Sequence, residues 1–426
     1  MRRPERLRVA TFYSYMCAGG DENRVLQYLP SRDDARFDVC VINGMSPDPH
    51  SEHLNGPIHH RIRELGVDLI DLGIPSDHQR RIDSPGIGLA LEQSRSFGLM
   101  VRRLAKVLKE RKIDLIDGRN NMGSVVATWG ARLAGTRAVV STNYELTRFD
   151  PQGWRQLGQA TYRMVDALVC DSQKCLDDMR SWMRWPPPGF MVPNGIVPPS
   201  SDRDPAELRR ELGIPADAVV VGQVARVQKI KGQDLLLRAC ARLKKEFPKV
   251  FVLIVGYHQQ ATGYAEELDG IVREHGMSDY VRQVSWPGPI GDMWQLIDVH
   301  AHPTRQDSSP IALMEGMSLG KPIVTTRIGG IHEIIDTGST GQLIDSDDLP
   351  ALESSLRRYL AEPRFAEAMG LGSLERHRSH HSQATMARNQ EAVYDEVWAD
   401  PFRLRKPGLL RPQPVATPTA APRPRA

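Results

Sequence analysis

Short apolar runs alternate with longer mixed segments along most of this chain of 426 residues. The runs have the length and β-branched content of buried strands, and the segments between them are long enough to hold helices. The strand-type runs lie at residues 7–12, 37–43, 68–72, 114–117, 138–142, 167–170, 190–192, 218–224, 250–255, 281–285, 297–303 and 323–326. The clearest helical segments lie at residues 21–29, 50–66, 100–112, 292–298, 310–320 and 385–398. Strands that alternate with helices pair in parallel through right-handed crossovers, so the pattern predicts an α/β protein with doubly wound sheets.

The length of the chain and one proline-containing stretch predict two domains. A chain of this length exceeds an ordinary single domain. A polar stretch with three prolines and two serines begins at Pro198 and is typical of a linker. We therefore expect α/β domains at residues 1–197 and 198–383. They are followed by a helix within residues 384–402 and by a Pro-, Arg- and Ala-rich tail at 403–426, which is expected to be disordered.

Composition excludes several classes of function. Hydrophobic residues make up 40% and charged residues 25% of the chain, as in soluble globular proteins. The net charge of +3 is small for this length, so no nucleic-acid partner is expected. The five cysteines show neither a zinc spacing nor a disulfide framework, which indicates a reducing, cytoplasmic compartment. No apolar run reaches about 18 residues, and the basic start leads into a strand rather than a signal peptide.

The segment Met100–Lys112 carries six basic residues around an apolar stripe. Such a helix either covers a sheet with a solvated basic face or lies on an anionic membrane surface. The sequence leaves both interpretations open, with peripheral membrane contact as the alternative.

An acidic stretch follows the apolar run at 297–303. Asp307 precedes a helix that begins near Pro310 and carries Glu315, and the next strand leads into a loop ending at Glu333. Because the carboxyl ends of parallel strands share one edge of a sheet, Asp307 and the loop at 329–333 should lie close together. Carboxylates accept hydrogen bonds from vicinal hydroxyls, and a helix start offers N–H groups to a phosphate, so a nucleotide sugar suits this edge. Singly, each acid is equally consistent with an ordinary surface carboxylate.

Two further loops follow strands and carry ligand-type residues. Arg226 and Lys231 come after the run at 218–224, and two cations at a strand end suit a diphosphate. Their alternative is a solvated basic loop. Gly19 and Gly20 follow the first strand and would let the backbone approach a ligand, or simply form a tight turn.

His300 and His302 point the same way if they lie on a strand, as metal ligands would. No third ligand stands at a suitable spacing. We therefore interpret them as packed or hydrogen-bonded histidines, and no metal is expected.

The stretch from Asp307 to Glu333 resembles the donor-site motif of retaining GT-B glycosyltransferases of family 4, also called the glycosyltransferase group 1 family. Asp307 stands where Glu is usual, and Arg226 and Lys231 have the spacing that this family shows before a glycine. The other matching motifs are Glu315, Gly320-Lys321-Pro322, Gly329-Gly330-x-x-Glu333, Asp171-Ser172 and Pro193-Asn194-Gly195. Many members carry a histidine where this chain has Arg119 or Asn143 and Tyr144, so the role of that histidine is open here.

The resemblance implies a GT-B fold, in which two doubly wound Rossmann-like domains face a cleft and a C-terminal helix crosses back to the first domain. It implies transfer of a hexose from a UDP- or GDP-linked donor to a glycan, lipid-linked or small-molecule acceptor, with retention of configuration. Neither a cofactor nor a metal is implied. The implied residues at the reacting groups are Arg226, Lys231, Asp307 and Glu315. The implied substrate-binding residues are Gly19, Gly20, Asn143, Tyr144, Ser308, Ser309, Pro310, Ile311 and Glu333.

Two other classes of protein remain as alternatives. A binding protein on the same fold could have lost catalysis, and Asp307 in place of Glu agrees with that. A nicotinamide oxidoreductase is disfavoured because the first strand is followed by Gly19-Gly20 alone and not by a Gly-x-Gly-x-x-Gly loop.

Overall fold

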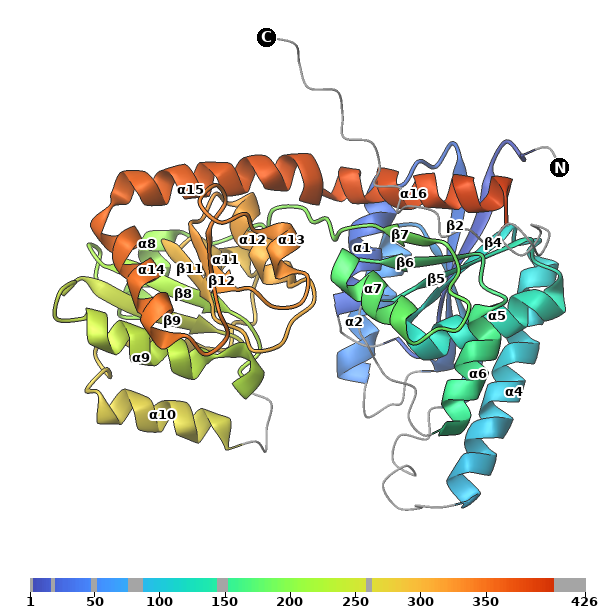
Figure 1. Ribbon diagram of the computed structural model, residues 1–426, viewed down its shortest axis with the longest axis horizontal. Coiled ribbons are helices and arrows are strands. Elements are labelled where there is room, and N and C mark those ends of the chain that lie inside the picture. Colours follow the sequence, from blue (N-terminus) through green and yellow to red (C-terminus); the bar gives the residue numbers. More distant parts are fainter. Residues whose placement is uncertain are drawn as a thin grey trace, which may run out of the picture. The chain divides into compact units, whose positions relative to one another are not determined.

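The computed structural model describes residues 3–16, 20–46, 52–75, 87–143, 152–257 and 263–401 (Figure 1). The chain forms two compact units, each built around one parallel sheet. The first unit contains the residues up to Asn194 together with those from Gln383 onward, and the second runs from Gly195 to Ser382. This is the GT-B arrangement of two Rossmann-like domains that the sequence predicts.

The first unit has a seven-stranded sheet in the order β3-β2-β1-β4-β5-β6-β7. Its strands are β1 (Leu7–Tyr13), β2 (Phe37–Ser46), β3 (Asp68–Pro75), β4 (Leu115–Arg119), β5 (Ala138–Thr142), β6 (Ala167–Cys170) and β7 (Gly189–Met191). Its helices are α1 (Gly20–Tyr28), η1 (Leu29–Ser31), α2 (Glu52–Glu64), α4 (Ile87–Glu110), α5 (Asn120–Ala134), α6 (Gln152–Tyr162), α7 (Gln173–Ser181) and α16 (Gln383–Ala399).

The second unit has a six-stranded sheet in the order β10-β9-β8-β11-β12-β13. Its strands are β8 (Val219–Val224), β9 (Val250–Val255), β10 (Val281–Val284), β11 (Val299–His302), β12 (Ile323–Thr326) and β13 (Gln342–Ile344). Its helices are α8 (Pro205–Glu211), η3 (Lys229–Lys231), α9 (Gln233–Leu243), α10 (Tyr264–Glu274), α11 (Gly291–Trp294), α12 (Ile311–Ser318), α13 (Ile331–Ile334), α14 (Leu349–Ala361), α15 (Pro363–Arg376) and η4 (His377–His381).

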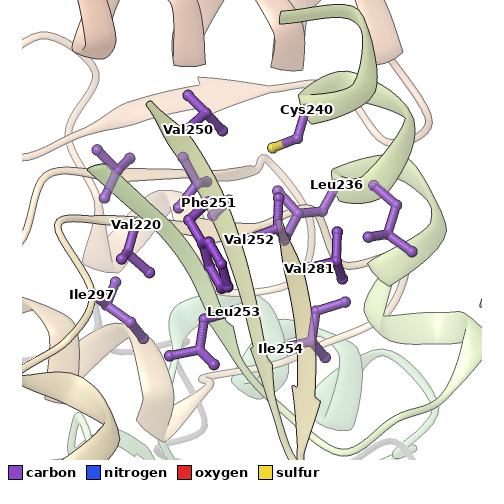
Figure 2. Packing of buried hydrophobic residues seen from close by; sticks show 14 of the residues in the cluster. Val220, Leu236, Cys240, Val250, Phe251, Val252, Leu253, Ile254, Val281 and Ile297 are labelled. Atoms are coloured by element: carbon purple, nitrogen blue, oxygen red, sulfur yellow. The ribbon is translucent and has the colours of Figure 1, made fainter. Parts of the chain in front are cut away.

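Buried apolar side chains hold helices to both faces of each sheet. In the second unit, every residue of β9 is buried, as expected for a strand covered on both faces. Figure 2 shows Phe251 of β9 among valines of the neighbouring strands, with Leu236 and Cys240 of α9 packed over the sheet. Truncation of a buried Phe side chain to Ala costs about 3–5 kcal/mol of stability, so this packing dominates the energetics of the unit.

The helix α16 belongs to the core of the first unit. It buries Tyr394, Val397 and Trp398 in the same cluster as residues of β1 and β2. The Tyr394 hydroxyl donates a hydrogen bond of 2.8 Å to the buried carboxylate of Asp117 in β4. The residues from 383 onward thus complete a hydrophobic core that is otherwise built by the first part of the chain.

Two predicted helices differ from the observed ones. The helix predicted at 100–112 is the second half of α4, which begins at Ile87 because the helix continues through glycines and serines that interrupt the apolar pattern. The helix predicted at 292–298 ends at Trp294. Beyond this helix, the backbone N–H of Asp298 donates to the carbonyl of Val220 in β8, so this part of the chain already belongs to the edge of β11 in the sheet.

The strand order places one ligand edge in the second unit. In an open parallel sheet, ligands bind outside the carboxyl ends of the strands, at the point where the strand order reverses. In the second sheet the reversal lies between β8 and β11, which are neighbours. The loops that follow these two strands therefore carry the residues of greatest interest.

Gly232 fixes the path of the loop after β8. Its φ is +69°, a left-handed conformation, and an added Cβ would lie 2.0 Å from the carbonyl oxygen of Pro303. Only glycine meets both conditions, because other residues disfavour this φ and the approach leaves no room for a methyl group.

We expect Gly232→Ala to lower the thermal unfolding temperature more than Gly276→Ala. Gly276 has a φ of +63° with no atom within 4 Å of an added Cβ, so that variant should lose only about 1–2 kcal/mol from the left-handed backbone. Gly232→Ala adds a clash with backbone. Differential scanning calorimetry of both variants measures the difference, and equal losses would contradict the close approach.

Candidate active site

The loops after β8 and β11 bring a cation and a carboxylate together. The Nζ of Lys231 lies 2.5 Å from Oδ2 of Asp307, and these side chains are 12% and 15% exposed. The Nε2 of the buried His302, the last residue of β11, lies 3.2 Å from the same oxygen. Burial alone would raise the pKa of Asp307, but the hydrogen bond from His302 and the charge of Lys231 outweigh it, so this pKa lies below its usual value. Asp307 is therefore a carboxylate at neutral pH.

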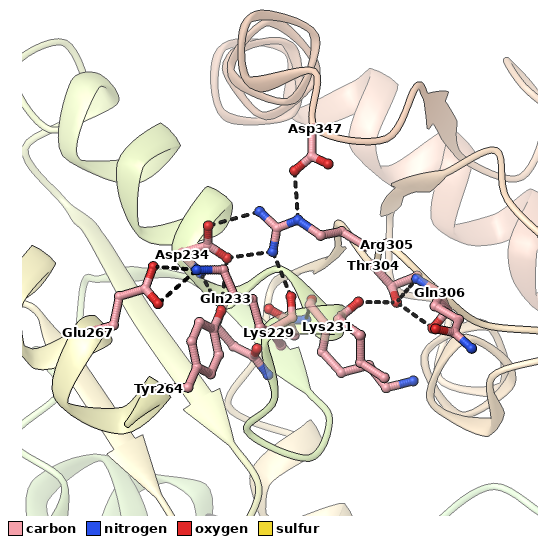
Figure 3. A network of polar contacts seen from close by, with 12 residues as sticks. Lys229, Lys231, Gln233, Asp234, Tyr264, Glu267, Thr304, Arg305, Gln306 and Asp347 are labelled. Carbon is pink, nitrogen blue, oxygen red and sulfur yellow. Dashed lines mark hydrogen bonds and ion pairs between the residues drawn. The ribbon is translucent and has the colours of Figure 1, made fainter. Parts of the chain in front are cut away.

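Arg305 holds the turn that carries Lys231. Its guanidinium forms a two-pronged ion pair with Asp234 at 2.8 Å for each prong and reaches Asp347 at 2.6 Å (Figure 3). It also donates to the carbonyl oxygen of Lys229 at 2.6 Å, and its backbone N–H donates to the carbonyl of Ile230. Bidentate pairs of this kind fix geometry as well as charge. The position of Lys231 is thus set by a residue that sequence reasoning did not single out.

Arg226 lies on the same loop and is exposed. Its backbone carbonyl accepts a hydrogen bond from Gln233, which ties the loop to the start of α9. Within the described part of the chain, its guanidinium makes no ion pair. The guanidinium of Arg226 can therefore bind a ligand without first breaking an ion pair.

Glu315 lies on α12, between β11 and β12. Its Oε2 accepts a hydrogen bond of 2.9 Å from the indole Nε1 of Trp294, which is fully buried. Burial raises the pKa of Glu315, and the hydrogen bond from Trp294 offsets this only in part. The site therefore holds this acid in surroundings that favour its protonated form.

The two loops predicted to share an edge do meet. The backbone N–H of Gly330 donates to the carbonyl of Ser308 at 2.9 Å. Gly329 has a φ of +52°, and a Cβ there would lie 1.9 Å from the carbonyl oxygen of Asp307. The close approach of these loops is confirmed, and it places Glu333, which is half-buried, on the helix that follows.

The helix start beside Asp307 is not capped by a side chain. Pro310 occupies the N-cap position and has no side-chain oxygen to accept from the first N–H groups of α12, which begins at Ile311. Ser308 and Ser309 precede it and engage other residues of the protein. Such a helix start offers backbone donors to an anion.

The candidates in the first unit have mixed outcomes. Gly19 and Tyr144 lie outside the described residues, and Gly20 is the first residue of α1. Asn143 was expected to face a ligand, but it is 1% exposed and its amide donates to the hydroxyl of Ser141 at 2.8 Å. The end of a strand fixes the edge on which a residue lies and not the direction of its side chain, and a ligand contact of Asn143 stays a prediction.

Arg119, which stands where many family members have histidine, is also buried. It pairs with Asp117 at 3.0 Å and with Asp21 at 3.6 Å. Burial raises the pKa of Asp21 to about 7, against the opposing charge of Arg119. A buried cluster of charged groups thus occupies the carboxyl ends of β1 and β4, where the first sheet reverses its strand order.

The histidines at 300 and 302 are packed and hydrogen-bonded, as interpreted from the sequence. Beside the contact of His302 with Asp307, Nδ1 of His300 lies 3.2 Å from the carbonyl oxygen of Gly222. Across the described ranges, no group of three or more His, Cys, Asp or Glu side chains is arranged to hold a metal ion. A search of the same residues finds no helix with the length and apolar character needed to cross a membrane.

Comparisons with known proteins define the class of this site. The family model described as "Glycosyl transferases group 1" matches residues 204–373, and the model described as "Glycosyl transferase 4-like domain" matches residues 19–195. Together the two matches span most of the chain, which belongs to the group 1 glycosyltransferases.

Curated relatives match part of the chain. A D-inositol 3-phosphate glycosyltransferase of Corynebacterium kroppenstedtii is 31% identical over 205 residues, which are 47% of this chain and 45% of that protein. One of Thermobifida fusca is 34% identical over 178 residues, which are 40% of this chain and 41% of that protein. The chain thus spans about half the length of the curated relatives it matches.

Solved structures match the whole fold. Anabaena HepE in complex with UDP and glucose superposes with a TM-score of 0.73 at 17% identity, covering 92% of this chain and 100% of that chain. Sucrose-phosphate synthase of Thermosynechococcus elongatus gives a TM-score of 0.69 at 19% identity, covering 92% and 100%. At these identities the likeness shows the GT-B fold alone.

We expect Glu315→Gln to stabilise the protein at neutral pH. A carboxyl whose pKa is raised in the folded state loses stability as pH rises above its ordinary value of 4.5, because the folded protein must then hold a buried charge. Gln keeps an acceptor for Trp294 without that charge. The unfolding temperature of the variant should exceed the wild-type value by about 2 °C or more at pH 7.5.

The difference should shrink as pH falls below 4.5, where the wild-type side chain becomes protonated in the unfolded state as well. Calorimetric scans across this pH range measure it. A variant that is less stable than the wild type at pH 7.5 would contradict the buried, charge-disfavouring site of Glu315.

Proposed function

We propose that this protein is a retaining glycosyltransferase that moves a sugar from a nucleoside diphosphate sugar to a hydroxyl acceptor. The observation that carries the proposal is the contact between Lys231 and Asp307 where the second sheet reverses its strand order. Lys231, a cation that suits a diphosphate, directly contacts Asp307, an acceptor that suits sugar hydroxyls. Arg226 and Glu315 complete the set that the resemblance implies.

The donor would be bound by four kinds of contact. Arg226 and Lys231 would hold the diphosphate, and the carboxylate of Glu315 would accept hydrogen bonds from the ribose hydroxyls. The carboxylate of Asp307 would accept hydrogen bonds from the hydroxyls of the sugar. Ser308 and Ser309 before α12, and Ile311 at its start, would add backbone N–H donors, while Pro310, which has no N–H, would only line the site. Glu333 would approach the sugar from the neighbouring loop.

The same contacts support catalysis. When the sugar leaves, negative charge develops on the leaving diphosphate oxygens. Fixed cations aimed at these oxygens stabilise the transition state more than the ground state. We propose a front-face reaction in which the leaving phosphate takes the proton of the acceptor hydroxyl, so the new bond forms on the face that the diphosphate leaves and configuration is retained.

The acceptor would be bound by the first unit. The relatives carry the name of inositol 3-phosphate glycosyltransferases, so inositol phosphate is the first acceptor to test, ahead of glycans and lipid-linked sugars. A cytoplasmic location is proposed, with contact to anionic membranes as a second possibility. The exposed basic side chains Arg102, Lys106 and Lys109 on α4 support that contact. Sedimentation with anionic and with neutral vesicles tests it, and equal, negligible binding to both would reject it.

The first experiment is calorimetric titration with UDP, GDP, ADP and CDP. UDP is the leading candidate, because HepE was solved with UDP. Binding of one nucleotide followed by turnover of its sugar conjugate would support the proposal, and nuclear magnetic resonance of the product's anomeric proton would report retention. Binding without turnover of any tested sugar conjugate would favour a binding protein on the same fold.

Lys231→Ala should lower turnover by about 10²–10³-fold, the loss typical of removing one fixed charge-stabilising group. The unfolding temperature should change little, because the turn is held by Arg305. Lys229→Ala is the matched control from the same turn: its Nζ pairs with Glu267 at 3.0 Å and its side chain is 64% exposed. Steady-state kinetics of the two variants measure the contrast, and full activity of Lys231→Ala would reject the diphosphate role.

A further inference from the structure

Each acid of the donor motif is held through one oxygen only. In Asp307, Oδ2 receives both Lys231 Nζ and His302 Nε2. In Glu315, Oε2 accepts from Trp294. Among the residues that the structure describes, none donates to Asp307 Oδ1 or to Glu315 Oε1. Each carboxylate thus keeps one oxygen for a ligand hydroxyl while the other is engaged by the protein.

The contact of His302 with Asp307 has a defined direction. A carboxylate only accepts hydrogen bonds, so Nε2 of His302 must carry the proton. Nδ1 is buried and makes no hydrogen bond within the described ranges. A proton on Nδ1 would be a buried donor without an acceptor, which is costly. The geometry therefore has His302 donating to Asp307 through Nε2.

A row of buried rings connects the two acids. His300 and His302 lie on one face of β11, with ring centroids 5.7 Å apart. The ring of His300 meets Trp294 edge-on at 4.8 Å. Burial lowers the pKa of His300 to about 3, so the ring in the middle of the row is neutral. The row Trp294–His300–His302 ends in an N–H donor on each acid.

We propose that His302 and Trp294 are positioning residues, which orient Asp307 and Glu315 so that their second oxygens face the nucleotide sugar. This inference rests on the proposed function. When Lys231 turns to the diphosphate, Asp307 still accepts from His302, so its buried oxygen is not left without a donor. A single lysine could then form an ion pair with Asp307 in the free protein and with the diphosphate in the complex.

Three substitutions of His302 test whether this residue positions Asp307. His302→Leu removes the donor, and we expect kcat/KM for the nucleotide sugar to fall by about 10–100-fold, as for loss of a hydrogen bond to a charged group. Gln places its Nε2 near the position of the imidazole Nε2, so His302→Gln should stay within about 3-fold of the wild type. Asn reaches no further than Nδ1, so His302→Asn should behave like His302→Leu.

Rescue by Gln but not by Asn separates positioning from packing, because both replacements are polar and both are smaller than His. If His302→Leu fails to fold, the comparison of Gln with Asn still decides. Wild-type activity in His302→Leu, or equal losses in Gln and Asn with unchanged unfolding temperatures, would overturn the proposal.

Trp294→Phe tests whether Trp294 positions Glu315. It removes the indole N–H and keeps most of the ring, so the affinity for the nucleoside diphosphate should fall by about 10-fold through a disordered Glu315. Trp129→Phe is the control, since Trp129 is exposed and its Nε1 donates to the buried Thr161 in the first unit. Unchanged affinity in Trp294→Phe would overturn this half.

One measurement is independent of any activity. Nuclear magnetic resonance of protein with ¹⁵N-labelled histidine reports which ring nitrogen of His302 carries the proton, with His302→Gln used to assign the signals. We expect Nε2 to carry the proton that is donated to Asp307. A proton on Nδ1 would overturn the inference even if transfer is observed, and an inactive wild type with the Nε2–H form would reject the proposed function alone.

Discussion

The ion pair between Arg305 and Asp234 is the constraint on which the rest of the site depends. It joins the loop after β11 to the start of α9, and through its contacts with Lys229 and Ile230 it fixes the turn between them. The Tyr264 hydroxyl donates to the same carboxylate at 2.8 Å, so Asp234 is held from two sides. A flexible lysine gains a defined position only because its backbone is held in this way, and a preorganised cation avoids the cost of being ordered during the reaction.

Much of the fold could be predicted from the sequence, and the reason is physical. Strands of a parallel sheet are buried on both faces, so β9 appears as a continuous apolar run. The strands β8 and β12 are rich in Val, Ile and Thr and also stand out from their surroundings. Amphipathic helices give weaker patterns, and the start of α4 was missed for that reason. The site's outline followed from the rule that ligands lie at the carboxyl ends of strands, because that rule needs only the order of the elements.

The partners of the site residues could not be predicted. Arg305 and Asp234 are 71 positions apart, and Trp294 and Glu315 are 21 apart, so no local periodicity links them. The direction of a side chain at a strand end is equally hidden, which explains why Asn143 was expected to be open and is buried. The resemblance identified residues with a role in a family, but it did not identify the residues that hold them in place.

The contribution of α16 to the first unit has a consequence for how the protein is made. The polypeptide leaves the first unit at Asn194, builds the whole second unit, and returns only at Gln383. In topological terms, the second unit is an insertion in the first. During synthesis on a ribosome, the second unit is complete when it emerges, whereas the first still lacks the buried side chains of Tyr394 and Trp398. The segment from Gln383, translated after the whole second unit, therefore closes the core of the first unit. A ribosome that stops short of it releases a chain with one finished unit and one unfinished one.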